Sequence, residues 1–420
     1  MSPEVLTEDS QAVLLLCSTL ALPRSEGAPK PLSRTEWNDL ARAIRSSSFE
    51  RPGALLGASQ ADVSRELALP PALSQRIQLL LERGAQLAIE RERLASRGIW
   101  TLTRADERYP SRLKERLKAL APPVLFGAGP VEAINRDSLA VVGSRDVDDA
   151  GAAFAKALGQ LCAESHLSVV SGAARGVDRI AMDGALELGG SGVAVLADSL
   201  EDTLKRRDTR DNVLSGRLTL LTPSHPSARF TVAAAMGRNK LIYALASWAV
   251  VVSSALETGG TWAGATENLS AGWVPLFVRA EEDAPEGNRA LIDKGAIPLS
   301  LSDVSESLPL WLENASQRPT IPPETVSELM KEVAPPFIVP DAPPPSEMFV
   351  VDIFSLAWPQ IASYLSEPRT IDDVVTAFAL ERVQVKVWLE RAAAEGKVTK
   401  LKRPARFQAV SETAAPGSLF

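Results

Sequence analysis

The sequence has little of the side-chain chemistry on which many enzymes depend. It holds two cysteines, Cys17 and Cys162, and two histidines, His166 and His225, in 420 residues. This scarcity argues against a disulfide framework, a histidine-ligated metal centre and a histidine-based triad. Zinc-ligand spacing, a Walker A motif and a complete dinucleotide fingerprint are also missing, which argues against familiar hydrolase and NAD-dependent chemistry. We therefore predict a protein without catalytic residues, metal or cofactor.

Long apolar runs are missing as well. The longest, from about residue 244 to 252, is interrupted by Ser247 and fits a buried strand rather than a membrane helix. The chain starts Met1-Ser2-Pro3-Glu4, with an acid and no basic stretch, so we predict no signal peptide and no membrane partner. We place the protein in a bacterial-type cytoplasm. The net charge of −7 argues against nucleic-acid binding over the whole surface, but a basic patch still acts locally.

Apolar strands and helices alternate in the middle of the chain. This rhythm predicts an α/β fold with a Rossmann-like, doubly wound parallel sheet as its core. We predict four segments: a helical N-terminal module over residues 1–97, the Rossmann-like core over 98–315, a proline-rich linker over 316–347 and a winged-helix domain over 348–412. The last assignment follows from the order helix, turn, helix, β-hairpin.

Some helix ends are marked by their residues. Ser33-Arg34-Thr35-Glu36 is a capping-box pattern. A long helix is predicted from Leu73 to Arg97, because Gly98 is a natural residue beyond a helix end. In the C-terminal domain, Thr370 is expected to cap a helix.

Cations gather on the hairpin predicted for the C-terminal domain. A winged helix can place such residues on DNA phosphates. Nearby acids offset much of the charge, so we favour a solvated hairpin or a protein-docking surface. The cations are Lys397, Lys400, Lys402, Arg403 and Arg406.

Two strand-to-helix turns carry the main functional signal. The carboxyl ends of parallel strands share one edge of a sheet, where free backbone N–H groups and positive helix ends meet a ligand. Each turn also offers an arginine, whose planar fork suits phosphate. The structural alternative is that Arg175 and Asp178 pair with each other, or cap the helix, and bind nothing. The residues predicted to bind phosphate in these turns are Gly143, Ser144, Arg145, Ser171, Gly172, Arg175 and Gly176.

Two later segments add further candidates. The segment from Gly237 to Lys240 is expected to open a helix, so that its N–H groups and cations point at one anion; a solvated first turn is the alternative. A glycine pair after another strand lets a ligand approach the backbone. The tryptophan that follows either packs in the core or stacks on a base. The predicted site therefore also includes Arg238, Asn239, Lys240, Gly259, Gly260 and Trp262.

Several motifs in order, between Gly98 and Ala296, resemble those of the DNA-processing protein A family (DprA, also called Smf). They are Val142–Arg145, Ser171–Asp178, Gly237–Ile242 and Gly287-Asn288 through Gly295-Ala296, preceded by Tyr109-Pro110 and Pro122–Gly127.

The resemblance implies binding of single-stranded DNA and handover to a RecA-type recombinase, as in natural transformation. It also implies a homodimer formed through the core and no established catalytic activity. The DNA-pocket residues that it implies are Ser144, Arg145, Arg175, Arg238 and Asn239.

The chain departs from the family pattern at three points. Met182 stands where histidine is usual, and Glu257 stands where lysine is common. Arginines (Arg206, Arg207 and Arg210) replace a Tyr-Pro pair usual before Asn212. These departures suggest a divergent branch, and they leave transformation, repair and phage defence all open as pathways.

A rival interpretation is a nucleotide sensor or a phosphoribosyl-type hydrolase. The segment from Gly259-Gly260 to Glu267 is loosely similar to the Gly-Gly-x-Gly-Thr-x-x-Glu motif of lysine decarboxylase-like proteins. In that interpretation Glu267 is an acid/base carboxylate and the ligand is a mononucleotide. We rank it second, because the inner Gly-Thr pair of the motif is not at the right place.

Overall fold

The computed structural model divides the chain into two compact units, Met1–Ala334 and Pro335–Phe420. It describes residues 6–22, 27–305, 307–317, 353–378, 382–401 and 406–409. None of the helices within these ranges is long and apolar enough to cross a membrane.

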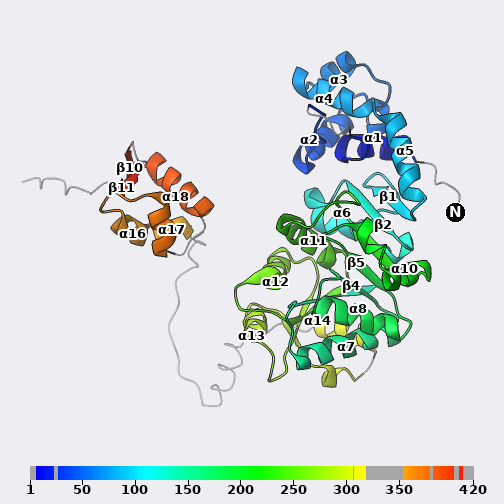
Figure 1. Ribbon diagram of the computed structural model, residues 1–420, viewed down its shortest axis with the longest axis vertical. Helices are drawn as coiled ribbons and strands as arrows, with labels where there is room; N and C mark the ends of the chain where they lie inside the picture. Colours follow the sequence, from blue (N-terminus) through cyan, green and yellow to red (C-terminus); the bar gives the residue numbers. More distant parts are fainter. Residues whose placement is uncertain are drawn as a thin grey trace, which may run out of the picture. The chain divides into compact units, whose positions relative to one another are not determined.

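A nine-stranded sheet forms the centre of the first unit (Figure 1). Its strands are β1 (Ile99–Thr103), β2 (Val124–Ala128), β3 (Ser138–Gly143), β4 (Ser168–Ser171), β5 (Gly192–Val195), β6 (Leu218–Thr222), β7 (Trp248–Ser253), β8 (Leu276–Arg279) and β9 (Ile297–Leu299). They lie in the order β1-β2-β6-β5-β4-β3-β7-β8-β9. In this spatial order, all neighbouring strands from β6 through β5, β4, β3, β7 and β8 to β9 are parallel. At the other edge, β2 pairs antiparallel with both β1 and β6. The predicted α/β fold with a Rossmann-like sheet is confirmed.

Helices cover both faces of this sheet. In β3, Ala140 and Val142 point into one core and Leu139 and Val141 into the opposite one, as the two-residue period of a strand requires. The first core is covered by α6 (Ser111–Leu117), α11 (Val232–Leu245), α12 (Gly259–Ala271) and α13 (Glu286–Asp293), and the second by α7 (Asp149–Glu164), α8 (Val177–Glu187) and α14 (Leu308–Gln317). Two short helices, α9 (Leu200–Thr203) and α10 (Arg207–Leu214), lie between β5 and β6 in the chain.

The N-terminal helices pack on the end of the sheet that carries β2, β5 and β6. Their core includes Trp37 and Ile77 together with Leu196 and Leu220. The capping box at Ser33 is present, since the Glu36 N–H donates to its Oγ and its own N–H donates to the Glu36 carboxylate. The helices are α1 (Glu8–Cys17), α2 (Arg34–Arg45), α3 (Gln60–Glu66), α4 (Pro71–Leu81) and α5 (Gly84–Ala95).

The single helix predicted from Leu73 to Arg97 is wrong, because the chain breaks between α4 and α5. The cause is Arg83, whose guanidinium is buried at the break. It donates to the carbonyl oxygens of Leu80 (3.1 Å), Leu20 (2.8 Å) and Leu15. Burying this charge costs much less when its N–H groups are satisfied by carbonyls, and a continuous helix would not bring the side chain there.

The second unit contains α16 (Ile353–Tyr364), α17 (Ile371–Phe378), α18 (Arg382–Ala394) and an antiparallel hairpin of β10 (Val398–Leu401) and β11 (Arg406–Ala409). Thr370 caps α17, as predicted, by accepting from the Asp373 N–H at 3.2 Å. The winged-helix assignment stays a prediction. Just before the hairpin, Lys397 pairs with Glu395 at 2.6 Å. Lys402, Arg403 and most of the predicted linker lie outside the described residues.

Candidate functional site

A small cavity opens where the strand order reverses, at the carboxyl ends of β3 and β7. Its volume is about 310 Å³. This switch point is where open α/β sheets bind ligands. The cavity is walled by the turn after β3, the middle of α11 and the first turn of α12. It brings together the predicted residues Gly143, Ser144, Arg145, Arg238, Asn239, Gly259 and Gly260.

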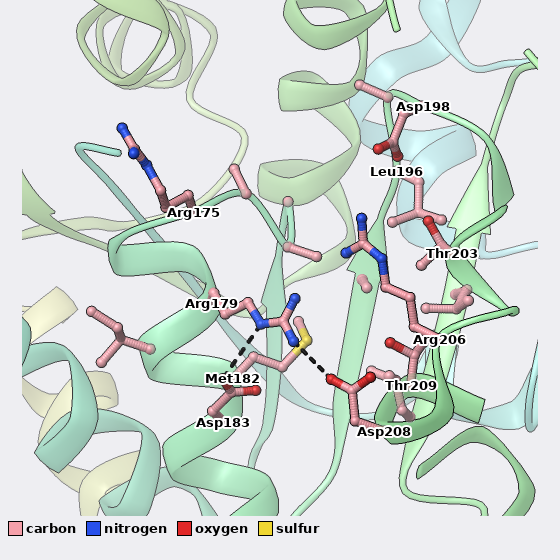
Figure 2. Close-up of a pocket in the computed structure, with 18 of the residues that line it drawn as sticks. Arg175, Arg179, Met182, Asp183, Leu196, Asp198, Thr203, Arg206, Asp208 and Thr209 are labelled. Atoms are coloured by element: carbon pink, nitrogen blue, oxygen red, sulfur yellow. Dashed lines mark hydrogen bonds and ion pairs between the residues drawn. The ribbon is translucent and has the colours of Figure 1, made fainter. Parts of the chain in front are cut away.

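A larger cavity, of about 930 Å³, lies next to the first and is lined by α8, α10 and the ends of β4 and β5 (Figure 2). Arg145, Ala174 and Arg238 line both cavities. The second predicted turn contributes Gly172, Arg175 and Gly176 to its wall. The two cavities therefore share a boundary made of two arginines.

The backbone N–H groups of the two turns are largely used within the protein, which corrects the expectation that they are free. The Ser144 N–H donates to Ser253 O at 2.9 Å, and the Val177 N–H donates to Ser144 O at 3.2 Å. The Gly172 N–H donates to the buried Asp178 carboxylate at 3.2 Å. Asp178 thus occupies the place that an anion would take at the second turn, which leaves side chains as the candidate ligand-binding groups there.

In the part of the chain that the structure describes, the first turn of α12 has no side-chain cap. Its N-cap residue Thr258 makes no side-chain hydrogen bond to the first turn, and that turn, with Gly260 and Thr261, lines the small cavity. Gly259 adopts a φ of +83°, which residues with a Cβ rarely do. The uncapped end leaves N–H groups and the positive end of the helix dipole for an anion.

Arg238 lies at the floor between the cavities and is 7% exposed. Its Nη1 is 3.9 Å from Asp178 Oδ2, which is too far for a hydrogen bond. Its Nε is buried without a partner. Burial lowers the pKa of Arg238 and raises the pKa of Asp178. An arginine nevertheless stays charged at neutral pH, so a cation lies in the cleft with its hydrogen-bonding capacity unused by the described residues.

Arg145 supplies a second cation on the same boundary. It is exposed, and no carboxylate in the described ranges pairs with it. Its guanidinium carbon lies 5.8 Å from the ring centre of Phe230, a cation–π distance. Phe230 is 49% exposed and lines the larger cavity. Sequence reasoning missed this aromatic residue, which stands in the loop before α11 without a pattern to mark it.

Arg175 lies at the rim of the larger cavity. Its side chain is 77% exposed and pairs with Asp146, so the alternative pairing with Asp178 is wrong. Figure 2 shows Arg175 directed away from the group formed by Arg179, Arg206 and Asp208.

Three predicted site residues lie outside both cavities. Lys240 pairs with Glu267. A cation predicted to bind phosphate and the carboxylate of the rival hydrolase interpretation therefore neutralise each other. Trp262 packs against the core, with the Lys294 ammonium 5.9 Å from its ring centre. Ser171 is buried and donates its hydroxyl to Val141 O at 2.7 Å.

The prediction that the segment from Gly237 to Lys240 opens a helix is also wrong. The helix α11 begins at Val232, and Thr231 caps it by accepting from the Ala234 N–H at 3.0 Å. Arg238 and Lys240 therefore lie in the body of the helix. Their side chains point in different directions, because residues two apart in the sequence do not face the same side of a helix.

Gly172 gives Arg238 its place. A Cβ on Gly172 would overlap the Arg238 guanidinium. We expect Gly172→Ala to displace this group and to weaken the oligonucleotide binding that the family resemblance implies roughly tenfold, the value of one charge-assisted hydrogen bond. Gly237→Ala is the matched control, since a Cβ there meets nothing within 4 Å. Fluorescence anisotropy measures both variants, and unchanged binding by Gly172→Ala would contradict this role.

The larger cavity also holds residues that the sequence did not suggest. Arg179 pairs with Asp183 at 3.5 Å and with Asp208 at 2.8 Å (Figure 2). Asp198, just beyond β5, could have been found by applying the strand-end rule to that strand. Two of the family departures, Met182 and Arg206, line this cavity too, whereas Glu257 lines neither.

An open, mainly parallel sheet with an arginine-lined cleft at its switch point defines a Rossmann-like protein. Residues 100–309 match the sequence model of the DNA recombination-mediator protein A family. The chain belongs to this family, which confirms the DprA/Smf resemblance.

Individual relatives agree with this assignment. The chain is 27% identical over 290 residues to Protein Smf of Escherichia coli strain K12, covering 67% of this chain and 72% of that protein. It is 30% identical over 158 residues to DNA processing protein DprA of Streptococcus pneumoniae, covering 37% of this chain and 54% of the relative. The structure of DNA processing protein A from Streptococcus pneumoniae has the same fold, with a TM-score of 0.52 and 21% identity over 72% of this chain and 98% of that one.

Proposed function

We propose that the chain binds single-stranded DNA without catalysing a reaction, and that phosphates lie against Arg145 and Arg238 at the switch point. The observation that carries this proposal is Arg238, a buried arginine that the described residues leave without a hydrogen bond. A buried charge normally has partners. A phosphate in the small cavity would provide them, together with the uncapped end of α12.

Two observations favour a strand over an isolated anion. The arginines stand between two cavities, so a ligand can extend on both sides of a bound phosphate. Phe230 offers half of its surface beside Arg145, and aromatic faces stack on unpaired bases. Membership of a recombination-mediator family supports DNA as this strand. By the same resemblance we propose a homodimer and delivery of the strand to a RecA-type recombinase.

The test is a competition titration. A fluorescent oligo-dT strand is bound to the full chain and displaced by unlabelled oligo-dT, by a duplex of equal length or by a mononucleotide. We expect the unlabelled strand to compete at least tenfold better than the duplex, because paired bases cannot stack on Phe230. Equal competition by the duplex would contradict the proposal, and stronger competition by the mononucleotide would favour the nucleotide-sensor interpretation.

A further inference from the structure

The helix α10 carries two arginines that the described residues leave unpaired. Arg206, the N-cap residue, and Arg210, one turn further on, are both exposed. No carboxylate in the described ranges forms an ion pair with either side chain. Arg207, between them, differs, because its Nε lies 3.8 Å from Asp211 Oδ2. Within the part of the chain that the structure describes, α10 therefore offers two cations to a ligand.

These two positions do not favour the helix itself. A cation at a helix N-terminus opposes the macrodipole, and like charges four residues apart on a helix repel each other. The Arg206 side chain makes no capping hydrogen bond to the first turn, unlike Ser33 of α2, whose Oγ accepts from the Glu36 N–H. Helix formation does not explain the two arginines, which favours a role in binding.

Arg206 and Arg210 lead away from the cleft. Arg206 lines the larger cavity together with Arg145 and Arg238, and Figure 2 shows it on the side of this cavity that α10 forms. Arg210 lines neither of the two cavities, so it lies beyond the rim. Side chains four residues apart are neighbours on a helix, with about 5–6 Å between their Cβ atoms. A strand with one phosphate on Arg206 can therefore place another on Arg210.

Neighbouring helices hold this part of the chain in place. Asp208 in α10 accepts from Arg179 of α8 at 2.8 Å. In the preceding helix α9, Glu201 pairs with Arg93 at 2.9 Å and with Arg97 at 2.6 Å, both from α5. The Glu201 side chain is only 13% exposed. Because the helix that carries the two arginines is fixed before a ligand arrives, less ordering is needed when one binds.

We propose that Arg206 and Arg210 form a second phosphate-binding surface, the α10 track, on which the strand continues after it leaves Arg145 and Arg238. This inference rests on the proposed function and adds a direction to it: the strand runs from the switch point toward α10. The planar fork of arginine suits phosphate, and a single strand carries a phosphate at every nucleotide. Arginines stand here in place of the Tyr-Pro pair of the family pattern, so the track is a feature of this chain.

The experiment measures the salt dependence of binding for two oligo-dT strands, of about 6 and about 16 nucleotides, within the usual range of single-strand footprints. Arg210→Gln is the sharper variant, because Arg210 lines neither cavity. For the long strand we expect it to lower the slope of log affinity against log salt by about 0.7, the share of one phosphate contact. Binding of the short strand should stay unchanged. Arg206→Gln combined with Arg210→Gln should lower the slope for the long strand by about 1.4.

Two further variants serve as controls. Arg42→Gln combined with Arg45→Gln removes two charges from exposed positions of α2, and we expect it to leave both strands unaffected. Arg206→Lys combined with Arg210→Lys keeps the charges of the α10 track, so its slope for the long strand should equal that of the wild type.

The outcomes separate the track from the proposed function. If Arg210→Gln changes the slope of neither strand, or lowers both by the same amount, the α10 track is wrong and the cleft alone holds the strand. An equal loss in the α2 control would show an effect of net charge and would also overturn the track. If the wild type binds neither strand, the proposed function itself fails.

Discussion

Replacing Arg238 by methionine is expected to weaken binding of single-stranded DNA roughly 100-fold and to destabilise the protein at neutral pH. The first effect follows because charge-assisted hydrogen bonds contribute about 1.5–3 kcal/mol each, and within the described residues this guanidinium makes no hydrogen bond, with its Nε buried and unpartnered. The second follows because Asp178 would stay buried without a countercharge. Breaking such a pair costs about 3–5 kcal/mol, or a melting temperature lower by about 5–10 °C.

The destabilisation should depend on pH in a defined direction. Burial already raises the pKa of Asp178, and Arg238 opposes that rise. Without Arg238 the pKa of Asp178 rises further. The cost of the ionised carboxylate is therefore largest above this raised pKa and disappears as the pH falls through it. Thermal unfolding from pH 8 to pH 5 should show the difference from wild type shrinking toward acid, and a constant difference would contradict this account.

A double variant separates stability from binding. Arg238→Met combined with Asp178→Asn removes both charges, and replacing both partners of a buried pair is often neutral or stabilising. We expect the double variant to regain most of the lost melting temperature while DNA binding stays weak. Recovery of both properties would show that Arg238 acts only through the fold.

Arg145→Ala is expected to weaken binding of single-stranded DNA about 10- to 30-fold, with little change in melting temperature. Arg145 is exposed and pairs with no described carboxylate, so its removal leaves no buried charge. A lost phosphate contact of about 1.5–2 kcal/mol produces a change of this size. Anisotropy titration measures the affinity, and differential scanning fluorimetry measures the stability.

Arg136→Ala is the matched control for this variant. Arg136 stands two residues before β3 and is also exposed, so the same change in net charge is made at the opposite end of the strand that leads to Arg145. If the two variants lose equal affinity, the effect is one of net charge and the cleft has no special role.

The site could be located from the sequence because strand ends are easy to recognise. Apolar runs ending in glycine marked β3 and β4, and a glycine pair a few residues further on followed the apolar run of β7; in a parallel sheet the carboxyl ends of such strands share an edge. That reasoning placed Gly143, Arg145 and Gly259 at one edge without knowledge of the strand order.

The details of the site depended on long-range contacts that no local pattern records. The helix α11 begins earlier than predicted because Thr231 caps it. Lys240 therefore lies in the body of the helix, where it pairs with Glu267. The two helices α4 and α5 separate because Arg83 reaches carbonyls that are distant in sequence, such as Leu20. The Gly172 amide of the second turn donates to Asp178 from the next helix, so we propose arginine side chains for the role that the sequence assigned to the backbone.

The large cavity escaped prediction for a similar reason. Its apolar floor comes from α8, β5 and β6, and the rest of its wall includes residues of α8, α9 and α10 and of the loops between β5 and α10. Each of these segments alone has the pattern of ordinary core or surface. Only their packing leaves the apolar floor uncovered.

The most direct test of the central claim is the salt dependence of oligo-dT binding for the wild type, for Arg145→Ala, and for Arg145→Ala combined with the Arg238→Met/Asp178→Asn pair. Each phosphate contact contributes about 0.7 to the slope of log affinity against log salt for a single strand. If these arginines hold phosphates, the slope falls by about 0.7 in the first variant and by about 1.4 in the second. A slope equal to that of the wild type in both would show that the strand binds elsewhere.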